Sequence, residues 1–340
     1  MKREKGLDFV RAVSIIGIVA FHFYAHSSSE QKLFLMHANG AWGGTLNYLF
    51  FALSGLVLHL KYGASDTLSL KSFYYKRWKS TMPAYLLVFS VAFLRHALQA
   101  GRFFYLPIPN YRLLFTLIGM DSYINMVTPT YFITGEWFLG AILLLYLIYP
   151  ILRFLINRYK YITLAALIIL YVYMLNINFF GMLVNVNPAT CMLSFYLGML
   201  IASNSSFLKK PIWVFGAALC CTILIIVPIG VPHITKEILI GVSLLITMNS
   251  IGNFICRNPY VYRLVSVICD LGYYTFLIHH RLMLNILPHF DPTNTGNAFL
   301  LLIAIFIVTQ FFAFLLNKIM KRLLHCQVFL KFENKLLGKA

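Results

Sequence analysis

Charged residues are scarce in this chain, and acidic residues above all. Only 11% of its 340 residues are Asp, Glu, Lys or Arg, and just 10 are acidic. Soluble domains carry roughly 25% charged residues, so this composition excludes an ordinary water-soluble globule. Cysteine is also sparse, and the six cysteines show no metal-ligand spacing. We therefore expect small buried apolar cysteines, with neither a disulfide scaffold nor a metal site.

Long apolar stretches make up most of the sequence instead. A helix needs about 20 apolar residues to cross the hydrocarbon core of a bilayer, with a range of roughly 17–25. Ten segments fit or approach this length: 8–26, 43–60, 81–98, 137–154, 161–178, 189–203, 212–230, 236–253, 266–288 and 298–317. The sequence therefore predicts an all-α, polytopic transmembrane helix bundle of about ten spans, forming a single domain over residues 1–340.

Lys and Arg are unevenly distributed between these segments. With the N-terminus in the cytoplasm, 21 of them fall on the cytoplasmic side and five on the outer side. Cytoplasmic loops retain basic residues, so we expect cytoplasmic termini, a basic cytoplasmic tail at 318–340 and an extracytoplasmic loop at 103–136. The apolar piece 113–120 in that loop is too short to span but could be re-entrant. The net charge of +18 then reflects topology and lipid attraction, and no nucleic-acid partner is expected.

The first span carries ionisable residues, which are costly inside a membrane. At about 100° per residue, Arg11 and His22 lie within about 20° of each other around the helix and about 16 Å apart along it, while Asp8 and His26 fall about 60° from Arg11. We interpret this stripe as functional; the alternative is an Arg11–Asp8 pair that only fixes helix packing. Because Arg11 and His22 interrupt the apolar run, we expect this segment to be retained and not cleaved as a secretory signal.

A basic cluster precedes the third span. Lys76, Arg77 and Lys79 stand in the predicted cytoplasmic loop before Pro83. They form either a patch that sets topology or a clamp for phosphate oxygens, which fixed Arg and Lys donors recognise. The sequence leaves both interpretations open.

Three further polar residues lie beside or within later spans. Glu136 comes directly before the fourth span, either as a charge at a helix N-terminus or as a carboxylate of a site. His279 and His280 lie in the ninth span and, being adjacent, point about 100° apart. We therefore expect one of the two to face the site.

Two short motifs contain small residues within predicted spans. They are FFALSG at 50–55 and FYLGM at 195–199. Small residues let membrane helices approach closely, so we interpret both as packing motifs.

Taken in order, six segments resemble the integral-membrane acyltransferase family 3. They are GLDFVRAVSIIGIVAFHFYAH, FFALSGLVL, FYYKRWKSTMPAYLL, EWFLGAILLLYLIYP, FYLGMLIA and LGYYTFLIHH. In this family the first helix carries a basic residue, ten further residues and a His, a spacing that Arg11 and His22 match. Two positions depart from the pattern: Ser80 replaces the second Arg of the basic run, and Ile142 stands where many members have an acidic residue.

The resemblance implies a membrane O-acyltransferase of the cytoplasmic membrane. Such enzymes move an acyl group, commonly acetyl, from cytoplasmic acetyl-CoA to a hydroxyl of a cell-surface polysaccharide or its lipid-linked precursor. His22 and Arg11 would be catalytic, with His22 as general base or acyl carrier, and Asp8 would orient Arg11. The donor is a co-substrate, and no permanently bound cofactor is expected.

The remaining candidate residues are expected on the two substrate sides. The donor phosphates would bind Lys76, Arg77 and Lys79, and the acceptor side would be lined by Glu136, His26, His279 and His280. A multi-span transporter or flippase for a polysaccharide precursor is the main alternative, because polar residues in membrane helices serve carriers equally well. The absence of an evident internal repeat counts against a carrier. A non-catalytic assembly subunit is a third interpretation.

Overall fold

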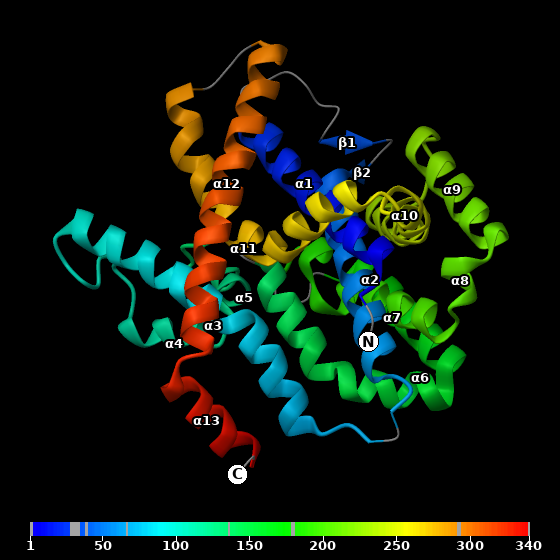
Figure 1. Cartoon of the computed structure of the whole chain (residues 1–340), viewed down its shortest axis with the longest axis horizontal. Helices are drawn as coiled ribbons and strands as arrows, with labels where there is room; N and C mark the ends of the chain where they lie inside the picture. Colours follow the sequence, from blue (N-terminus) through cyan, green and yellow to red (C-terminus); the bar gives the residue numbers. More distant parts are fainter. Residues whose placement is uncertain are drawn as a thin grey trace.

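A computed structural model describes residues 3–27, 35–37, 40–65, 67–134, 137–177, 181–290 and 294–338, which form a helical bundle (Figure 1). Within these ranges one pair of strands occurs, β1 (Met36–His37) and β2 (Gly40–Ala41), which are antiparallel. The predicted helical class is confirmed apart from this two-residue ladder.

The longer helices follow the predicted spans. They are α1 (Lys5–His26), α2 (Trp42–Tyr62), α3 (Leu70–Ala100), α6 (Trp137–Asn176), α7 (Pro188–Ser203), α9 (Pro211–Ile226), α10 (His233–Ile255), α11 (Pro259–Phe290) and α12 (Thr295–Leu324). Among the described residues, seven helices are long and apolar enough to cross a membrane, and α7 and α9 are shorter. The chain is therefore a multi-pass membrane protein, while a count of ten spans stays a prediction.

Helix α6 contains two of the predicted spans. Its 40 residues would extend about 60 Å if straight, twice the thickness of a bilayer core. The backbone leaves the helical conformation at Tyr159, with φ −132° and ψ 41°. This break falls between the predicted segments 137–154 and 161–178, so the boundary placed there from the sequence has a structural counterpart.

The basic run predicted as a loop is helical instead. Helix α3 begins at Leu70 and continues through Arg77 and past Pro83. Lys and Arg interrupt an apolar run, but both are good helix formers, so hydropathy alone placed the start of this helix too late. Lys76, Arg77 and Lys79 consequently project from one helix.

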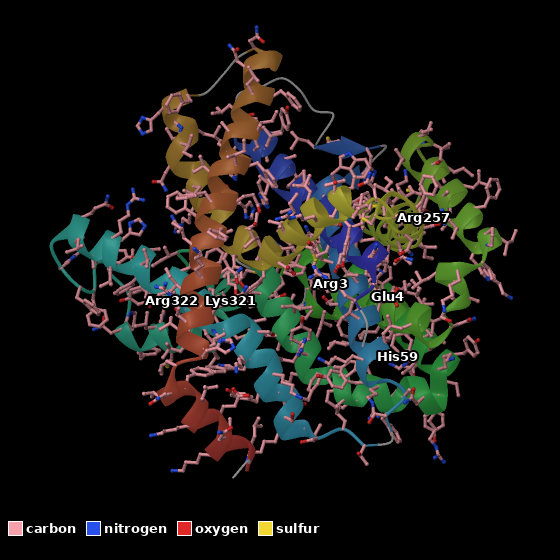
Figure 2. All side chains as sticks on the ribbon, in the orientation of Figure 1. Arg3, Glu4, His59, Arg257, Lys321 and Arg322 are labelled. Carbon is pink, nitrogen blue, oxygen red and sulfur yellow. The ribbon has the colours of Figure 1, made fainter. Side chains whose placement is uncertain are left out.

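Short elements connect the long helices, and the last of these elements follows α12 at the end of the chain. They are η1 (Asn110–Arg112), α4 (Leu113–Leu117), α5 (Asp121–Asn125), η3 (Val184–Val186), α8 (Ser206–Lys209) and α13 (Gln327–Leu337). The segment between α3 and α6 packs back onto α3, where Phe93 contacts Tyr105 and Tyr131. At the other end of the chain, Lys321 and Arg322 lie near the end of α12 (Figure 2), and Glu333 of α13 forms an ion pair with Lys79.

Helices α1 and α2 make the contacts that organise the bundle. Helix α2 packs along α7, and α1 packs against α2, α10 and α11. A Cβ added at Gly55 would overlap the carbonyl of Phe195, and one at Gly198 would overlap the carbonyl of Ala52. The packing interpretation of the two small-residue motifs is thus confirmed, because only glycine allows this approach of α2 and α7.

Candidate active site

Asp8 is the centre of a polar cluster near the start of α1. Its carboxylate is only 4% exposed and accepts hydrogen bonds from the Tyr262 hydroxyl at 3.1 Å and the Cys269 thiol at 3.4 Å. It forms ion pairs with Arg3, which Figure 2 places at the start of α1, and with Arg11 at 3.6 Å. Cys269, expected to be merely apolar, also lies 3.3 Å from Arg11 Nη1. Asp8 therefore binds two cations and not Arg11 alone.

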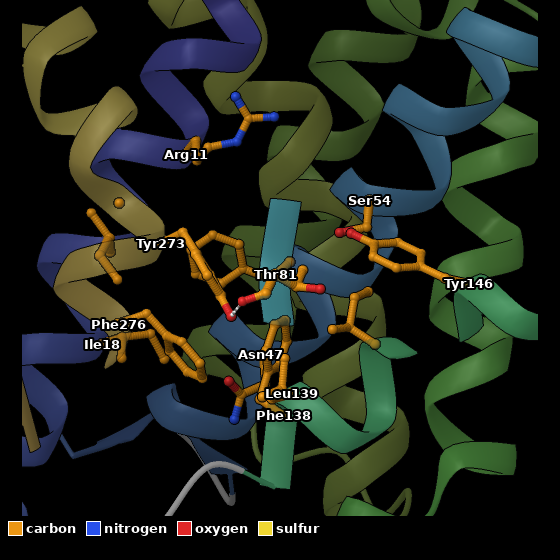
Figure 3. A pocket seen from close by; sticks show the side chains of 14 residues that line it. Arg11, Ile18, Asn47, Ser54, Thr81, Phe138, Leu139, Tyr146, Tyr273 and Phe276 are labelled. Carbon is orange, nitrogen blue, oxygen red and sulfur yellow. Dashed lines mark hydrogen bonds between the residues drawn. The ribbon is translucent and has the colours of Figure 1, made fainter. Parts of the chain in front are cut away.

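Arg11 lines a cavity of about 160 Å³, which we call the arginine cavity. Figure 3 shows the guanidinium on the same side of this space as Tyr273, with Ser54 and Tyr146 across from it. The Tyr273 hydroxyl donates to the Thr81 carbonyl at 2.9 Å. Residues of α1, α2, α3, α6 and α11 complete the lining: Ile15, Ile18, Asn47, Phe50, Thr81, Phe138, Leu139, Ile142, Gly272 and Phe276. The walls are mostly apolar, with a few hydroxyls and one cation.

His22 lines a second cavity, of about 380 Å³, which we call the histidine cavity. Its other lining residues are Phe21, Met36, Gly40, Ala41, Gly43, Gly44, Asn47, Tyr48, Trp137, Asn185, His233 and Glu237. Asn47 lines both cavities, so the two adjoin. Arg11 and His22 therefore project from one face of α1 into two neighbouring cavities, separated by about three helical turns.

Glu237 is a residue of the histidine cavity that the sequence interpretation missed. Its side chain is 3% exposed, and a carboxylate oxygen accepts the Ala41 N–H at 2.9 Å. A Cβ at Gly44 would overlap this carboxylate. An acidic residue at the edge of the predicted span 236–253 was a usable signal, but Lys236 beside it is one of the five basic residues assigned to the outer side. Lys236 is instead fully buried in α10 and donates to the Val227 carbonyl at 3.2 Å.

Four histidines gather where α1 and α11 meet. The ring centroid of His22 lies 5.2 Å from those of both His279 and His280. His26, one turn further along α1, has its Nε2 3.0 Å from Nε2 of His280. Only one of the adjacent histidines of α11 was expected to face the site. Both approach His22, and the rings of His279 and His280 lie 6.2 Å apart, so the three rings form a triangle.

His279 has its protonation pattern fixed by the backbone. Its Nδ1 lies 2.8 Å from the Phe276 carbonyl oxygen, which can only accept, so Nδ1 carries the proton. The other ring nitrogen, Nε2, is buried and has no hydrogen-bond partner among the described residues. The side chain is 2% exposed. A buried nitrogen lone pair is thus held beside the His22 ring.

The three basic residues of α3 are not brought together. The Arg77 guanidinium lies 5.6 Å from the ring centroid of Tyr146, which lines the arginine cavity. Lys79 is engaged with Glu333, and Lys76 is exposed to the surroundings. Glu136, the other predicted site carboxylate, lies outside the described residues.

Three of the histidines have an arrangement that could hold a metal ion, although the sequence predicted no metal site. One ligand nitrogen each from His22, His26 and His280 lies within 4.8 Å of the others. His22 and His280 are more than 250 residues apart in the sequence. No short spacing between histidines could therefore have indicated this cluster.

Comparison with known proteins identifies one match. A family model described as an acyltransferase domain matches residues 4–318, and this range includes every residue that lines the two cavities. No curated protein and no solved structure matches the chain.

Proposed function

Because the chain belongs to the acyltransferase-domain family, we propose that it is a membrane O-acyltransferase. The proposed reaction moves an acyl group, acetyl in the simplest case, from acyl-CoA to a hydroxyl of a cell-surface polysaccharide or its lipid-linked precursor. The proposed location is the cytoplasmic membrane, with both termini in the cytoplasm. The observation that carries this proposal is the projection of Arg11 and His22 from one helix into two adjoining cavities.

The two cavities suit two substrates that approach from opposite ends of α1. A donor in the cytoplasm and an acceptor outside it must meet within the protein, because CoA does not cross the membrane during transfer. The arginine cavity, with Arg77 near Tyr146, offers cations for phosphates. The histidine cavity offers polar groups for a sugar: Asn47, Tyr48, Asn185 and Glu237. Lys79 would have to exchange Glu333 for a phosphate to contribute.

His22 is proposed as the general base. It accepts the proton of the acceptor hydroxyl while the hydroxyl oxygen attacks the carbonyl carbon of the thioester. Collapse of the tetrahedral intermediate breaks the carbon–sulfur bond, and the imidazolium returns the proton to the CoA thiolate. The products are an ester and free CoA. A covalent acyl-histidine on His22 is the second route by which an imidazole catalyses such a transfer.

Arg11 and Asp8 are proposed to act as a pair on the donor side. From the wall of the arginine cavity, Arg11 can donate hydrogen bonds to the acyl-CoA, while the ion pair with Asp8 holds the guanidinium in place. Asp8 is then a positioning residue, because its own partners are Arg3, Tyr262 and Cys269 and it does not line the cavity.

The test is release of free CoA by the purified chain in lipid nanodiscs, given acetyl-CoA and a mixture of surface glycans. We expect His22→Ala and Arg11→Ala to lower the rate at least about 100-fold, while His289→Ala, at an exposed position of α11 outside the cluster, leaves it unchanged. CoA should be separated by chromatography, because the exposed Cys220 and Cys326 would consume a thiol reagent.

Three results would contradict this proposal. Full activity of His22→Ala would remove the base, and no CoA release from any donor would favour a carrier, which leaves the thioester intact. A loss of activity matched by an equal loss of folded protein would favour a structural role, so thermal unfolding is measured on each variant.

A further inference from the structure

We propose that His22, His26 and His280 form a binding site for a divalent transition-metal ion of the Zn²⁺ class. The proposal goes beyond acyl transfer, because binding requires only these three imidazoles. Its consequence for catalysis rests on the proposed role of His22 as base.

The ring nitrogens fit this class of ion once small side-chain movements bring them closer together. One nitrogen from each histidine lies within 4.8 Å of the other two, and Nε2 of His26 lies 3.0 Å from Nε2 of His280. Zinc–nitrogen bonds of about 2.0–2.1 Å in a tetrahedron place the ligand nitrogens about 3.3 Å apart. The widest pair therefore needs to close by at most about 1.5 Å, which side-chain rotation can supply.

Two helices hold the three ligands in place. His22 and His26 are four residues apart on α1, so they lie on one face of that helix. His280 comes from α11, which packs along α1. A metal ion would thus crosslink two helices that are already in contact, and little chain entropy would be lost on binding.

Exposure and ligand chemistry both favour a reversible site. His26 is exposed, whereas His22 and His280 are half-buried, so an ion can reach the site without unfolding. Neutral imidazole suits Zn²⁺, Cu²⁺ and Ni²⁺, whereas Mg²⁺ and Ca²⁺ prefer oxygen ligands. The adjacent cation, Arg281, lines a separate cavity with His96 and Asn285.

Three protein ligands leave a fourth position on a tetrahedral ion. Because His22 lines the histidine cavity, water in this position would lie at the cavity edge. Nε2 of His279 is buried and has no hydrogen-bond partner among the described residues, and its ring lies 5.2 Å from that of His22, so it is an acceptor near this position. A hydrogen bond from metal-bound water would satisfy this nitrogen.

Metal binding should oppose the proposed catalysis. The lone pair of the His22 nitrogen that binds the ion is no longer available to accept a proton from the acceptor hydroxyl. We therefore expect Zn²⁺ to inhibit acyl transfer over the concentration range in which it binds.

Metal binding is tested without reference to activity, on the full chain in detergent with its affinity tag removed and its metals stripped by chelator. Titration with Co²⁺ should produce a visible absorption band typical of tetrahedral nitrogen ligation, at one ion per chain, which Zn²⁺ abolishes. His26→Ala and His280→Ala should each weaken Co²⁺ binding at least about tenfold. His289→Ala and His325→Ala, at exposed positions outside the cluster, should bind as the parent does.

The outcomes separate the metal site from the proposed function. Absence of the band in the parent chain, or equal losses in the cluster and control variants, would overturn the metal site. Binding of Co²⁺ by a chain that releases no CoA would keep the metal site and overturn the acyltransferase. In an active chain, the Zn²⁺ concentration for half-inhibition should rise at least about tenfold in His280→Ala, relative to its own uninhibited rate; inhibition unchanged by this variant would overturn the competition with the base.

Discussion

The α2–α7 and α1–α11 interfaces join neighbouring helices of one bundle by opposite means. Between α2 and α7, Gly55 and Gly198 bring the two backbones so close that any side chain there would overlap a carbonyl group. Between α1 and α11, Asp8 and Cys269 contact each other near one end, and His22 and His279 near the other. The first interface is set by the close approach of two backbones, and the second adds polar side chains near both ends to its apolar contacts.

The contrast explains where the cavities lie. Among the described residues, no residue of α7 lines either cavity, in keeping with the lack of room where its backbone meets that of α2. Both cavities are instead lined by α1, through Arg11 in one and His22 in the other. A rigid α2–α7 pair can then act as the support against which α1 is held.

The largest effect is expected from a single methyl group in the glycine interface. Gly198→Ala places a Cβ on the Ala52 carbonyl, and the helices can relieve this overlap only by separating along their length. We expect a loss of more than about 3 kcal/mol of stability, or no folded protein. Thermal unfolding in detergent measures this loss.

Gly216→Ala is the matched control, because Gly216 lies in α9 and no atom of the described residues lies within 4 Å of an added Cβ. Alanine is the better helix former, so this variant should gain up to about 1 kcal/mol. Equal behaviour of the two variants would show that the close approach of α2 and α7 does not matter to the fold.

A smaller effect is expected at the polar interface. Asp8→Asn removes the charge that compensates Arg3 and Arg11 and weakens the hydrogen bond from Tyr262. We expect a cost of about 2 kcal/mol, typical of a buried hydrogen-bonded charge. Thermal unfolding measures this cost, and kinetics should show a higher KM for acyl-CoA if Asp8 positions Arg11.

Asp270→Asn provides the comparison for Asp8. Asp270 also pairs with Arg3, at 2.9 Å, but its side chain is 58% exposed. Water screens such a pair, so its loss should cost less than about 1 kcal/mol. If Asp270→Asn destabilised the protein as much as Asp8→Asn, burial would not be the reason why the Asp8 cluster contributes to stability.

Much of the fold could be predicted because the length of an apolar segment is a local property of the sequence. The apolar segments, the boundary near Tyr159 in α6 and the packing role of Gly55 and Gly198 all follow from local composition. The extent of α3 could not be predicted from hydropathy. The charged residues of its first turns precede the apolar run, although they belong to the same helix.

Only part of the candidate site could be predicted from local sequence patterns. Helical periodicity on one segment placed Arg11 and His22 on a common face, since only the rotation per residue was needed. The meeting of His22 with His279 and His280, and the position of Glu237 in the same cavity, depend on how helices pack against each other. No local pattern encodes those distances.

The third comparison concerns a buried carboxylate whose partners are hydroxyl groups, whereas those of Asp8 include cations. Asp121 of α5, outside the helices of spanning length, is 3% exposed and accepts from the Tyr85 hydroxyl at 3.0 Å and Thr116 Oγ1 at 2.8 Å. Burial raises the pKa of Asp121 from 3.8 to about 6, although both hydrogen bonds act to lower it. The folded protein therefore keeps this proton to a higher pH than the unfolded chain.

The sign of the pH dependence follows from that order of proton loss. The stability contributed by protonated Asp121 is complete below pH 3.8 and is lost as the pH rises through about 6. Between pH 5 and pH 7 the loss should be about 1.3 kcal/mol. Asp121→Asn should remove this part of the change in thermal unfolding, and Tyr85→Phe should enlarge the change at the upper end, because it removes a donor to the ionised carboxylate. Identical pH profiles for the parent and Asp121→Asn would mean that hydroxyl partners stabilise a buried carboxylate as fully as the arginines beside Asp8.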